Sequence, residues 1–201
     1  MTDQPDLFAP EAPPDNDPAI PGLAAFAGIV TAAEQSRLAA RIDAAPLEPF
    51  KFGQWTGKRL TAHYGSAYDY ARGTVTPAPP LPDWLLALRE RVCAAAGRDP
   101  AAFVQALLIR YDPGAGIGWH RDRPQYAEVL GLSLGAPATL RLRRRASDGR
   151  FERHAHPLAP GAAYLLTGEA RGEWEHSITP LEQTRWSVTF RSMKDRESFP
   201  A

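Results

Sequence analysis

The stretch Arg185-Trp186-Ser187-Val188-Thr189-Phe190-Arg191 alternates polar and apolar side chains at every position. A period of two is typical of a β-strand, because successive side chains point to opposite faces of the sheet. The stretch therefore predicts a strand with one apolar face and a polar face that carries Arg185, Ser187, Thr189 and Arg191. A polar inward face favours a bound anion, since Arg is the natural bidentate partner of a carboxylate. The alternative is an edge strand whose arginines are solvated.

Short strand-like runs continue through the second half of the chain. Apolar runs separated by Gly and Pro cover residues 103–111, 129–134, 139–145, 151–156, 162–166 and 186–191. Asp148-Gly149, between two of these runs, is typical of a hairpin turn. Many short strands that follow two helices predict the α+β class, as a double-stranded β-helix (jelly roll) with N-terminal helices packed on one sheet.

The two helices are predicted from their end signals. Thr31 followed by Glu34 is a capping-box pattern, which predicts a helix over residues 32–45. A proline-rich turn then leads into a second helix, over residues 83–96, which a glycine ends. Residues 50–76, between the helices, are predicted to be strands or loops with exposed aromatic side chains.

The composition is that of a globular protein with a single domain. The chain has 201 residues, of which 44% are hydrophobic and 23% charged, and one cysteine, Cys93, in an apolar helical stretch. One cysteine excludes an intramolecular disulfide framework, so we expect a buried thiol and a cytoplasmic protein. The longest apolar run, residues 23–30, is too short to span a membrane, and no secretory signal is visible at the acidic N-terminus. We expect a monomer without membrane association.

Charge divides the chain into an acidic tail and a mildly basic body. The first of the 23 Lys and Arg residues is Arg37, and six of the 23 Asp and Glu residues precede it. Residues 1–18 are rich in Pro, Asp and Ala and lack hydrophobic periodicity, so we expect a disordered acidic tail there and one folded domain over residues 19–201. A basic body is compatible with a polyanionic partner without demonstrating one.

Three side chains form a possible metal site. His120 and Asp122 are separated by one residue, and on a strand that spacing places both on one face. His176 comes much later, beside an apolar strand and before Arg185. Two His and one carboxylate on one side of a metal leave the opposite positions open, which is the facial triad of non-haem Fe(II) oxygen chemistry. His-x-Asp alone is a weak signal, and the alternative is a loop histidine hydrogen-bonded to the aspartate.

The order and local spacing of the motifs strongly resemble the AlkB family of Fe(II)- and 2-oxoglutarate-dependent dioxygenases. The matching motifs are Tyr111-Asp112-Pro113-Gly114, His120-x-Asp122, Ser133-Leu134-Gly135, His176 and the Arg185–Arg191 stretch with its ending Thr189-Phe190-Arg191. The likeness covers about residues 50–193 and implies an Fe(II)/2-oxoglutarate dioxygenase domain over residues 19–201, with a jelly-roll core at about 103–193. A looser likeness of Arg59, Tyr64-Gly65 and Asp69-Tyr70 to the family's nucleotide-recognition lid implies a lid at about residues 50–76.

The resemblance implies the metal chemistry of the site. His120, Asp122 and His176 are the implied Fe(II) ligands and catalytic centre. The implied co-substrates are 2-oxoglutarate and O2, which are converted to succinate and CO2 while an N-methyl group on a base is oxidised. The hydroxymethyl product then releases formaldehyde and leaves the unmodified base.

The resemblance also implies how the co-substrate binds. Arg185 pairs with the distal carboxylate of 2-oxoglutarate, Tyr111 hydrogen-bonds the same molecule, and Arg191 closes the pocket. Ser187 and Thr189 share the polar face between the two arginines and are candidate co-substrate contacts.

The chain departs from the family pattern at two places. The family usually has Asn two residues before the co-substrate Tyr, where this chain has Ile109, and Gln105 is a candidate replacement for the lost hydrogen bond. Just beyond Asp122, nucleobase repair members often carry acidic residues that contact the base, whereas this chain has Arg123-Pro124-Gln125. The second departure bears on the identity of the substrate.

Aromatic and basic side chains in residues 50–76 are candidates for substrate binding. They are Trp55, Tyr64, Tyr68 and Tyr70, which could stack on a flipped or single-stranded base, and Arg59, which could meet phosphates. The alternative for each aromatic ring is packing in the core or in the lid.

One hairpin concentrates basic side chains, and its interpretation stays open. The arginines are Arg141, Arg143, Arg144, Arg145, Arg150 and Arg153. They form either a solvated face or a groove for a second strand of nucleic acid, whose contribution to affinity would depend on salt. His154 and His156 share a strand face there but have no carboxylate at metal-ligand spacing, so we do not expect them at the metal.

Gln4-Pro5-Asp6-Leu7-Phe8 in the acidic tail resembles the short motif by which bacterial DNA enzymes dock on the replication sliding clamp. In that motif Gln enters one subsite and the Leu-Phe pair fills an apolar pocket. Exposed Leu7 and Phe8 in a disordered tail have no core to join, which favours docking. The motif predicts a sliding clamp as partner, through Gln4, Leu7 and Phe8, and favours DNA as substrate.

Three functions are compatible with these residues. The first is an Fe(II)- and 2-oxoglutarate-dependent oxidative demethylase that repairs N-alkylated bases in nucleic acid, with DNA as the expected polymer. The second is an oxygenase with the same cofactors that acts on a protein side chain or a small molecule, which the residues after Asp122 favour. The third is a non-catalytic jelly-roll binding module, against which the intact triad weighs.

Overall fold

The computed structural model describes residues 15–16, 20–52, 54–69 and 74–194. Most of the predicted acidic tail, including the motif from Gln4 to Phe8, lies outside the described residues. Within the tail, β1 (Asp15–Asn16) is described as a short strand that pairs antiparallel with Ala24 and Ala25.

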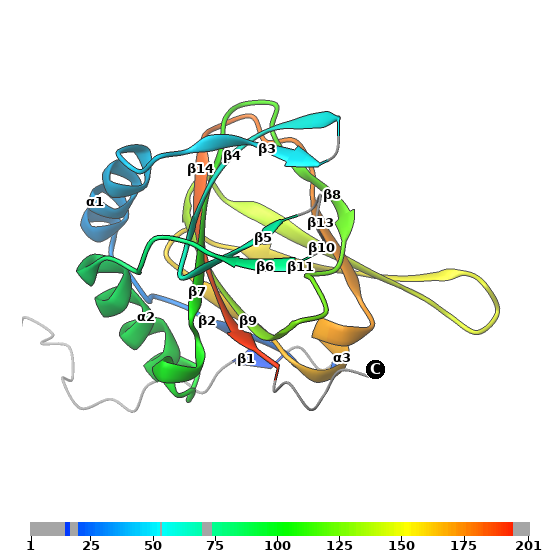
Figure 1. The fold of residues 1–201 in the computed structure, drawn as a ribbon. Coiled ribbons are helices and arrows are strands. Elements are labelled where there is room, and N and C mark those ends of the chain that lie inside the picture. Colours follow the sequence, from blue (N-terminus) through cyan, green and yellow to red (C-terminus); the bar gives the residue numbers. More distant parts are fainter. Residues whose placement is uncertain (1–14, 17–19, 53, 70–73, 195–201) are drawn as a thin grey trace, which may run out of the picture.

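Two antiparallel sheets face each other and form the predicted jelly roll (Figure 1). In the described part of the chain the large sheet contains, in spatial order, β1, β2 (Leu23–Phe26), β12 (Ala163–Leu166), β9 (Tyr126–Gly135), β14 (Arg185–Met193), β7 (Gln105–Tyr111), β4 (Trp55–Tyr64) and β3 (Glu48–Phe52). The described strands of the small sheet are, in order, β11 (Phe151–Leu158), β10 (Ala138–Arg145), β13 (Glu175–Ile178) and β8 (Ile117–His120). A separate hairpin pairs β5 (Ser66–Asp69) with β6 (Thr74–Pro77).

Two helices lie against the outer face of the large sheet, as predicted (Figure 1). α1 (Ala32–Asp43) begins with the expected capping box, in which Glu34 N donates to Thr31 Oγ1 at 3.3 Å and Thr31 N donates to Glu34 Oε2 at 2.9 Å. α2 (Asp83–Ala95) buries Cys93 in the core between helix and sheet, which confirms the buried thiol. Among the described residues, no helix combines the length and the apolar character that crossing a membrane requires.

β14 lies in the middle of the large sheet and has the two faces that its alternation predicts. Trp186, Val188 and Phe190 pack in the core beneath the helices. The four polar side chains of the opposite face line a cavity between the two sheets. The prediction of a two-faced strand is therefore confirmed.

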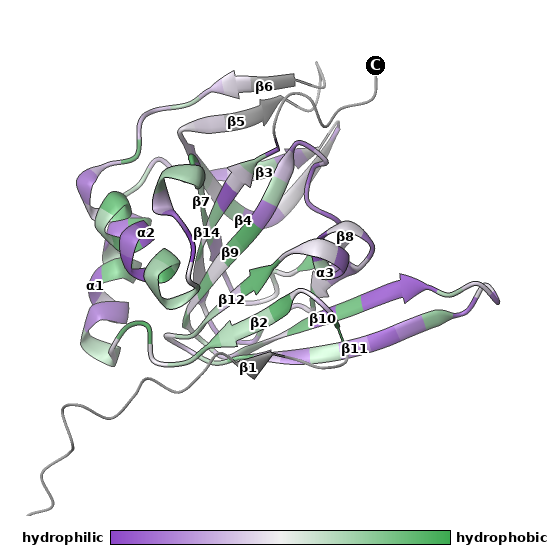
Figure 2. Cartoon of the chain, turned by 90° about the horizontal axis from the view of Figure 1, so that it is seen from below, coloured by the Kyte–Doolittle hydropathy of each residue, from purple (hydrophilic) through white to green (hydrophobic). Residues whose placement is uncertain are grey.

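The hairpin of β10 and β11 extends beyond the body of the fold and becomes hydrophilic toward its turn (Figure 2). Its turn lies at Asp148-Gly149, as predicted, and Gly149 has a φ of 83°, which favours glycine. The remaining short elements are η1 (Pro100–Ala102), which precedes β7, and α3 (Gly168–Gly172), which precedes β13.

One local prediction is wrong. β8 ends at His120, so Asp122 lies in the loop that follows rather than on the same strand. The same-face argument from strand geometry therefore does not explain why these two side chains meet. The contacts of Asp122, described below, supply the reason.

Candidate metal centre and co-substrate pocket

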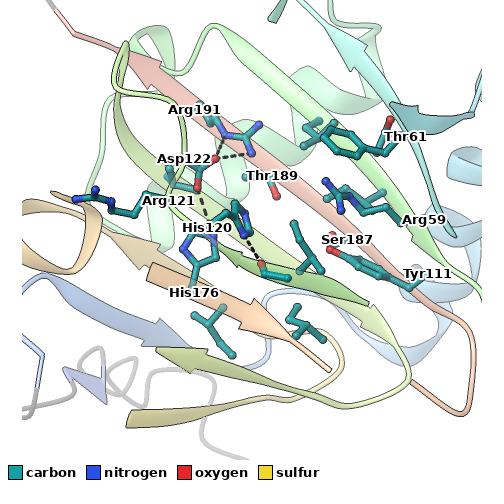
Figure 3. Close-up of a pocket in the computed structure, with 18 of the residues that line it drawn as sticks. Arg59, Thr61, Tyr111, His120, Arg121, Asp122, His176, Ser187, Thr189 and Arg191 are labelled. Carbon is teal, nitrogen blue, oxygen red and sulfur yellow. Dashed lines mark hydrogen bonds and ion pairs between the residues drawn. The ribbon is translucent and has the colours of Figure 1, made fainter. Parts of the chain in front are cut away.

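A cavity of about 480 Å³ lies between the two sheets (Figure 3). Inward side chains of β4, β7 and β14 contribute one wall, and β8 and β13 contribute to the other. The fold gathers around it the residues predicted for the metal and the co-substrate. They are Tyr111, His120, Asp122, His176, Arg185, Ser187, Thr189 and Arg191.

His120, Asp122 and His176 lie close enough to share one metal ion. One nitrogen or oxygen atom from each residue lies within 4.8 Å of the others. His176 on β13 pairs directly with His120 on β8, and cross-strand partners share a face, so the two ring centroids are 4.3 Å apart. His176 Nε2 lies 3.5 Å from Asp122 Oδ2.

Both imidazoles are held in the state that binds a metal. His120 Nδ1 lies 2.9 Å from the carbonyl oxygen of Gly118, so we assign the ring proton to Nδ1, which leaves Nε2 as the ligand atom. Burial lowers the pKa of His120. Burial, followed by the neighbouring His120, lowers the pKa of His176 to about 3. Both rings are therefore neutral at physiological pH.

Asp122 is held in place and kept ionised by Arg191. Arg191 Nε and Nη2 each lie 2.7 Å from Asp122 Oδ1 (Figure 3). Burial alone would raise the pKa of Asp122, but the charge of Arg191, together with the two histidines, more than offsets burial and the net shift is downward. Because Arg191 occupies Oδ1, Oδ2 is the oxygen that faces His176 and can bind a metal.

This donor set fits Fe(II). Two neutral imidazoles and one carboxylate gathered on one side leave the remaining coordination positions open toward the cavity, as a facial triad requires. In the described ranges, these three side chains are the one cluster of His, Cys, Asp and Glu tight enough for a metal, and His154 and His156 on β11 are not part of it.

Arg185 is a buried cation at the opposite end of the polar face of β14 from Arg191. The residue is 1% exposed. Its Nε donates to Ser133 Oγ at 3.1 Å, while Nη1 is buried and has no hydrogen-bond partner among the described residues. Its guanidinium carbon lies 5.1 Å from the ring centroid of Tyr111, its direct partner on β7. Since a buried charge is costly without a counter-ion, Arg185 fits the distal carboxylate of a dicarboxylic co-substrate.

The departure at Ile109 leaves an apolar patch in the polar wall. Ile109 lines the cavity directly opposite Ser187 in the pairing of β7 with β14. Gln105 does not replace the missing donor there. Its side chain is buried outside the cavity lining, and its Oε1 accepts a hydrogen bond from Arg191 Nη1 at 2.9 Å.

The residues predicted to bind substrate are placed less uniformly. Arg59 lines the cavity (Figure 3). Its guanidinium carbon lies 3.8 Å from the ring centroid of Phe50. Tyr64 is an odd number of positions further along β4, so it lies on the opposite face, where it packs against the hydrophobic core. Trp55 and Tyr68 belong to β4 and β5, but their side chains, and all of Tyr70, lie outside the described part of the structure.

Several cavity residues were not predicted from the sequence. They are Thr61, His63, Trp119, Tyr126 and Tyr164. Thr61 and His63 follow Arg59 at intervals of two on β4, a pattern that could have identified them. His63 Nδ1 is buried without a hydrogen-bond partner among the described residues, and burial, followed by Arg191, lowers the pKa of His63 to about 4.

The arginines of the β10–β11 hairpin divide into two groups. The guanidinium carbons of Arg141 and Arg143 lie 4.8 Å and 4.5 Å from the ring centroid of Trp119, at the edge of the cavity. Arg143 also pairs with Glu175, at 2.6 Å. Arg144 forms ion pairs with three carboxylates, those of Glu152, Glu169 and Glu173. Arg144 therefore belongs to a structural network, whereas Arg141 and Arg143 connect the basic hairpin to the cavity.

Comparisons with known proteins agree with this geometry. The family model described as the 2OG-Fe(II) oxygenase superfamily matches residues 29–196. The "Alpha-ketoglutarate-dependent dioxygenase AlkB" of Salmonella typhimurium is 28% identical over 96% of this chain and 99% of its own length. The "Alkylated DNA repair protein ALKBH8 homolog" of Arabidopsis thaliana is 28% identical over 92% of this chain, which spans 59% of that relative.

A solved structure shares the fold. The structure of OsALKBH1 superposes with a TM-score of 0.66 at 16% identity, over 86% of this chain and 97% of that one. Together with the facial triad and the buried Arg185, the family match and the AlkB relatives show that the chain is an AlkB-like member of the 2OG-Fe(II) oxygenase superfamily, a dioxygenase that uses Fe(II), 2-oxoglutarate and O2.

Proposed function

We propose that this protein is an oxidative demethylase that removes N-methyl groups from the bases of alkylated nucleic acid, with DNA as the polymer. The observation that carries the proposal is one cavity that joins a facial triad, a buried arginine whose Nη1 has no partner in the described part of the chain, and a rim of aromatic and basic side chains.

The metal end of the cavity would hold Fe(II) through His120, Asp122 and His176. Bound Fe(II) supplies the activation of O2, with 2-oxoglutarate as the source of two electrons. Arg191 keeps Asp122 ionised and leaves one carboxylate oxygen for the metal. The Gly118 carbonyl fixes the orientation of the His120 ring, which is the usual role of a hydrogen bond behind a metal ligand.

The co-substrate end orients a dicarboxylate. Arg185 binds the distal carboxylate, and Ser133 holds its Nε so that the remaining guanidinium nitrogens face the anion. Ser187 and Thr189 present hydroxyl groups along the same wall. The reaction consumes O2 and 2-oxoglutarate, forms succinate and CO2, and converts N–CH3 to N–CH2OH, which loses formaldehyde and restores the N–H of the base.

The rim favours a nucleic acid among possible substrates. Phe50 and Trp119 line the cavity with aromatic rings on which a base can stack, and Arg59 and Arg141 contribute positive charge beside them. Two relatives carry names that describe AlkB and alkylated-DNA repair proteins, and these names support the same substrate class for this chain.

A second candidate is an oxygenase of the same cofactor chemistry that acts on a protein side chain or a small molecule. Arg123-Pro124-Gln125 favours it, because Arg123 lines the cavity where nucleobase repair members often carry acidic residues.

The decisive test is anaerobic reconstitution with Fe(II), followed by air, 2-oxoglutarate and an N-methylated single-stranded DNA oligonucleotide. We expect the methylated oligonucleotide to lose the mass of one CH2 unit per turnover, with formation of formaldehyde and succinate, and an unmethylated oligonucleotide to show no change. Succinate without any change in methylated DNA or RNA would favour the second candidate. Methylated DNA and RNA that both stay intact, without succinate, would contradict the proposal.

We further propose that Gln4, Leu7 and Phe8 dock this protein on the replication sliding clamp, which would bring it to newly exposed DNA. Full-length protein should bind an immobilised bacterial clamp, and Leu7→Ala with Phe8→Ala should abolish that binding without changing succinate formation. Equal binding by the double variant would overturn this proposal and leave the demethylase proposal intact.

A further inference from the structure

The phenol of Tyr164 lies inside the co-substrate pocket, on a strand that is otherwise apolar. β12 contributes Ala163, Leu165 and Leu166 to the hydrophobic cores, whereas Tyr164 also lines the cavity. Its hydroxyl forms no hydrogen bond with any residue in the described ranges. A phenol that faces a polar cavity without a protein partner is available to a ligand.

Gly131 fixes the position of this ring. Gly131 on β9 pairs directly with Tyr164 on β12 and with Thr189 on β14, so the three residues lie in one row across the sheet. A Cβ at Gly131 would collide with the Tyr164 ring and would lie 2.5 Å from its hydroxyl oxygen. The phenol therefore lies across β9, and its hydroxyl is directed toward the polar face of β14.

The row of Gly131 lies between the two arginines of β14. Arg185 and Arg191 flank Thr189 on the polar face, and the charges of both arginines and of Asp122 act on the phenol. Burial raises the pKa of Tyr164 to about 12, so the hydroxyl keeps its proton at physiological pH and can donate a hydrogen bond.

On the opposite side of β14, Leu107 on β7 is the partner of Thr189 and lines the cavity with an apolar side chain. Ile109, the partner of Ser187 in the next row, is apolar as well, and Gln105 is occupied with Arg191. A dicarboxylate that lies along β14 between Arg185 and the triad therefore meets hydroxyl donors on β14 and the Tyr164 phenol on the β9–β12 side.

We propose that Tyr164 is a co-substrate-binding residue, whose hydroxyl donates a hydrogen bond to 2-oxoglutarate from the β12 side, opposite the apolar side chains of Leu107 and Ile109 on β7. This inference rests on the proposed use of 2-oxoglutarate. It assigns a binding role to a residue that the sequence places within an apolar run.

The test is equilibrium binding of 2-oxoglutarate to the Fe(II)-loaded protein under anaerobic conditions, measured by calorimetry, so that no turnover is required. Tyr164→Phe keeps the ring over Gly131 and removes only the hydroxyl. We expect its dissociation constant for 2-oxoglutarate to rise about tenfold, as the loss of a hydrogen bond to a charged or strongly polar group implies, with an unchanged melting temperature.

Two comparisons make the result specific. Tyr64→Phe, on the other face of β4, removes a phenol hydroxyl outside the cavity and should bind 2-oxoglutarate as the wild type does. Glutarate, which lacks the keto group, locates the contact. If Tyr164→Phe loses the same affinity for glutarate as for 2-oxoglutarate, the hydroxyl contacts a carboxylate. If it loses affinity for 2-oxoglutarate alone, the hydroxyl contacts the keto oxygen.

The outcomes separate this inference from the proposed function. If Tyr164→Phe binds 2-oxoglutarate like the wild type while Arg185→Ala binds it much more weakly, the role of Tyr164 is overturned and the co-substrate assignment stands. If the wild type itself does not bind 2-oxoglutarate, both the proposed function and this inference fail.

Discussion

The two ends of the cavity are built in different ways. The metal and co-substrate end uses paired strands and buried charges: Arg185 is 1% exposed, and Asp122 lies 2.7 Å from two nitrogens of Arg191. The proposed substrate end uses β4, where the buried Arg59 lies 3.8 Å from the ring of Phe50, and the β10–β11 hairpin, where the half-buried Arg141 and Arg143 lie 4.8 Å and 4.5 Å from the ring of Trp119. Removing the partner of a buried charge costs much more free energy than removing the partner of an exposed charge. Substitutions at the metal and co-substrate end should therefore have larger effects than substitutions in the hairpin.

The largest effects are expected at the triad. His120→Ala should abolish Fe(II) binding and reduce succinate formation to background, because two ligands hold the metal poorly. Asp122→Ala should also destabilise the fold, by about 3–5 kcal/mol, because it leaves the buried Arg191 without its counter-ion. Metal content and denaturant unfolding would measure these changes. His154→Ala, outside the cluster, is the control, and sustained turnover in His120→Ala would remove the triad from the mechanism.

The next effect is expected at Arg185. Arg185→Ala should weaken 2-oxoglutarate binding by about 30-fold or more, since truncating one partner of a buried charge pair costs about 2–5 kcal/mol. Arg185→Lys keeps the positive charge but lacks the planar guanidinium, so its affinity for 2-oxoglutarate should lie between those of the wild type and Arg185→Ala. Anaerobic titration of the Fe(II)-loaded variants measures the affinity. An Arg185→Ala variant with wild-type affinity would show that the dicarboxylate binds elsewhere.

The contrast between the two ends also explains what could be predicted from the sequence. Strict alternation identifies the polar face of β14, and the capping box identifies α1, because both signals are local. Which side chains of β4 face the cavity depends on the register of the strand, because a shift of one residue moves every side chain to the other face. The sequence alone therefore could not show that Thr61 and His63 face the cavity and Tyr64 the core.

Other features depend on contacts between distant segments. Asp122 reaches the metal centre from a loop because Arg191 holds it, a partner that spacing alone does not reveal. Tyr164 lies within an apolar run, and only its pairing with Gly131 shows that its hydroxyl faces the polar wall.

A smaller, salt-dependent effect is expected at the rim. Arg141→Gln should raise the KM for a methylated oligonucleotide about two- to fivefold and reduce the salt dependence of binding by about one phosphate contact, with unchanged affinity for 2-oxoglutarate. Arg144 lies three residues further along β10 and pairs with three glutamates, so Arg144→Gln should lower the melting temperature instead. Identical salt slopes for wild type and Arg141→Gln would exclude the hairpin from nucleic-acid binding.

The smallest effect concerns acid stability at His63. Burial lowers its pKa from 6.5 to about 4 in the folded protein, so the unfolded chain binds a proton at higher pH than the folded chain. The stability that neutral His63 contributes is therefore present above about pH 6.5 and is lost as the pH falls toward 4. His63→Gln should lose less stability over this range than the wild type, as measured by urea unfolding. If the free energy of unfolding of the wild type and of His63→Gln changed equally with pH, His63 would not titrate in this way.

The most direct test of the buried metal and co-substrate end is a crystal structure of the protein prepared anaerobically with Fe(II) and 2-oxoglutarate. The metal should bind His120, Asp122 and His176, and the distal carboxylate should lie within hydrogen-bond distance of Arg185 Nη1. A metal bound by other residues, or a carboxylate away from Arg185, would contradict the assignment of the buried end.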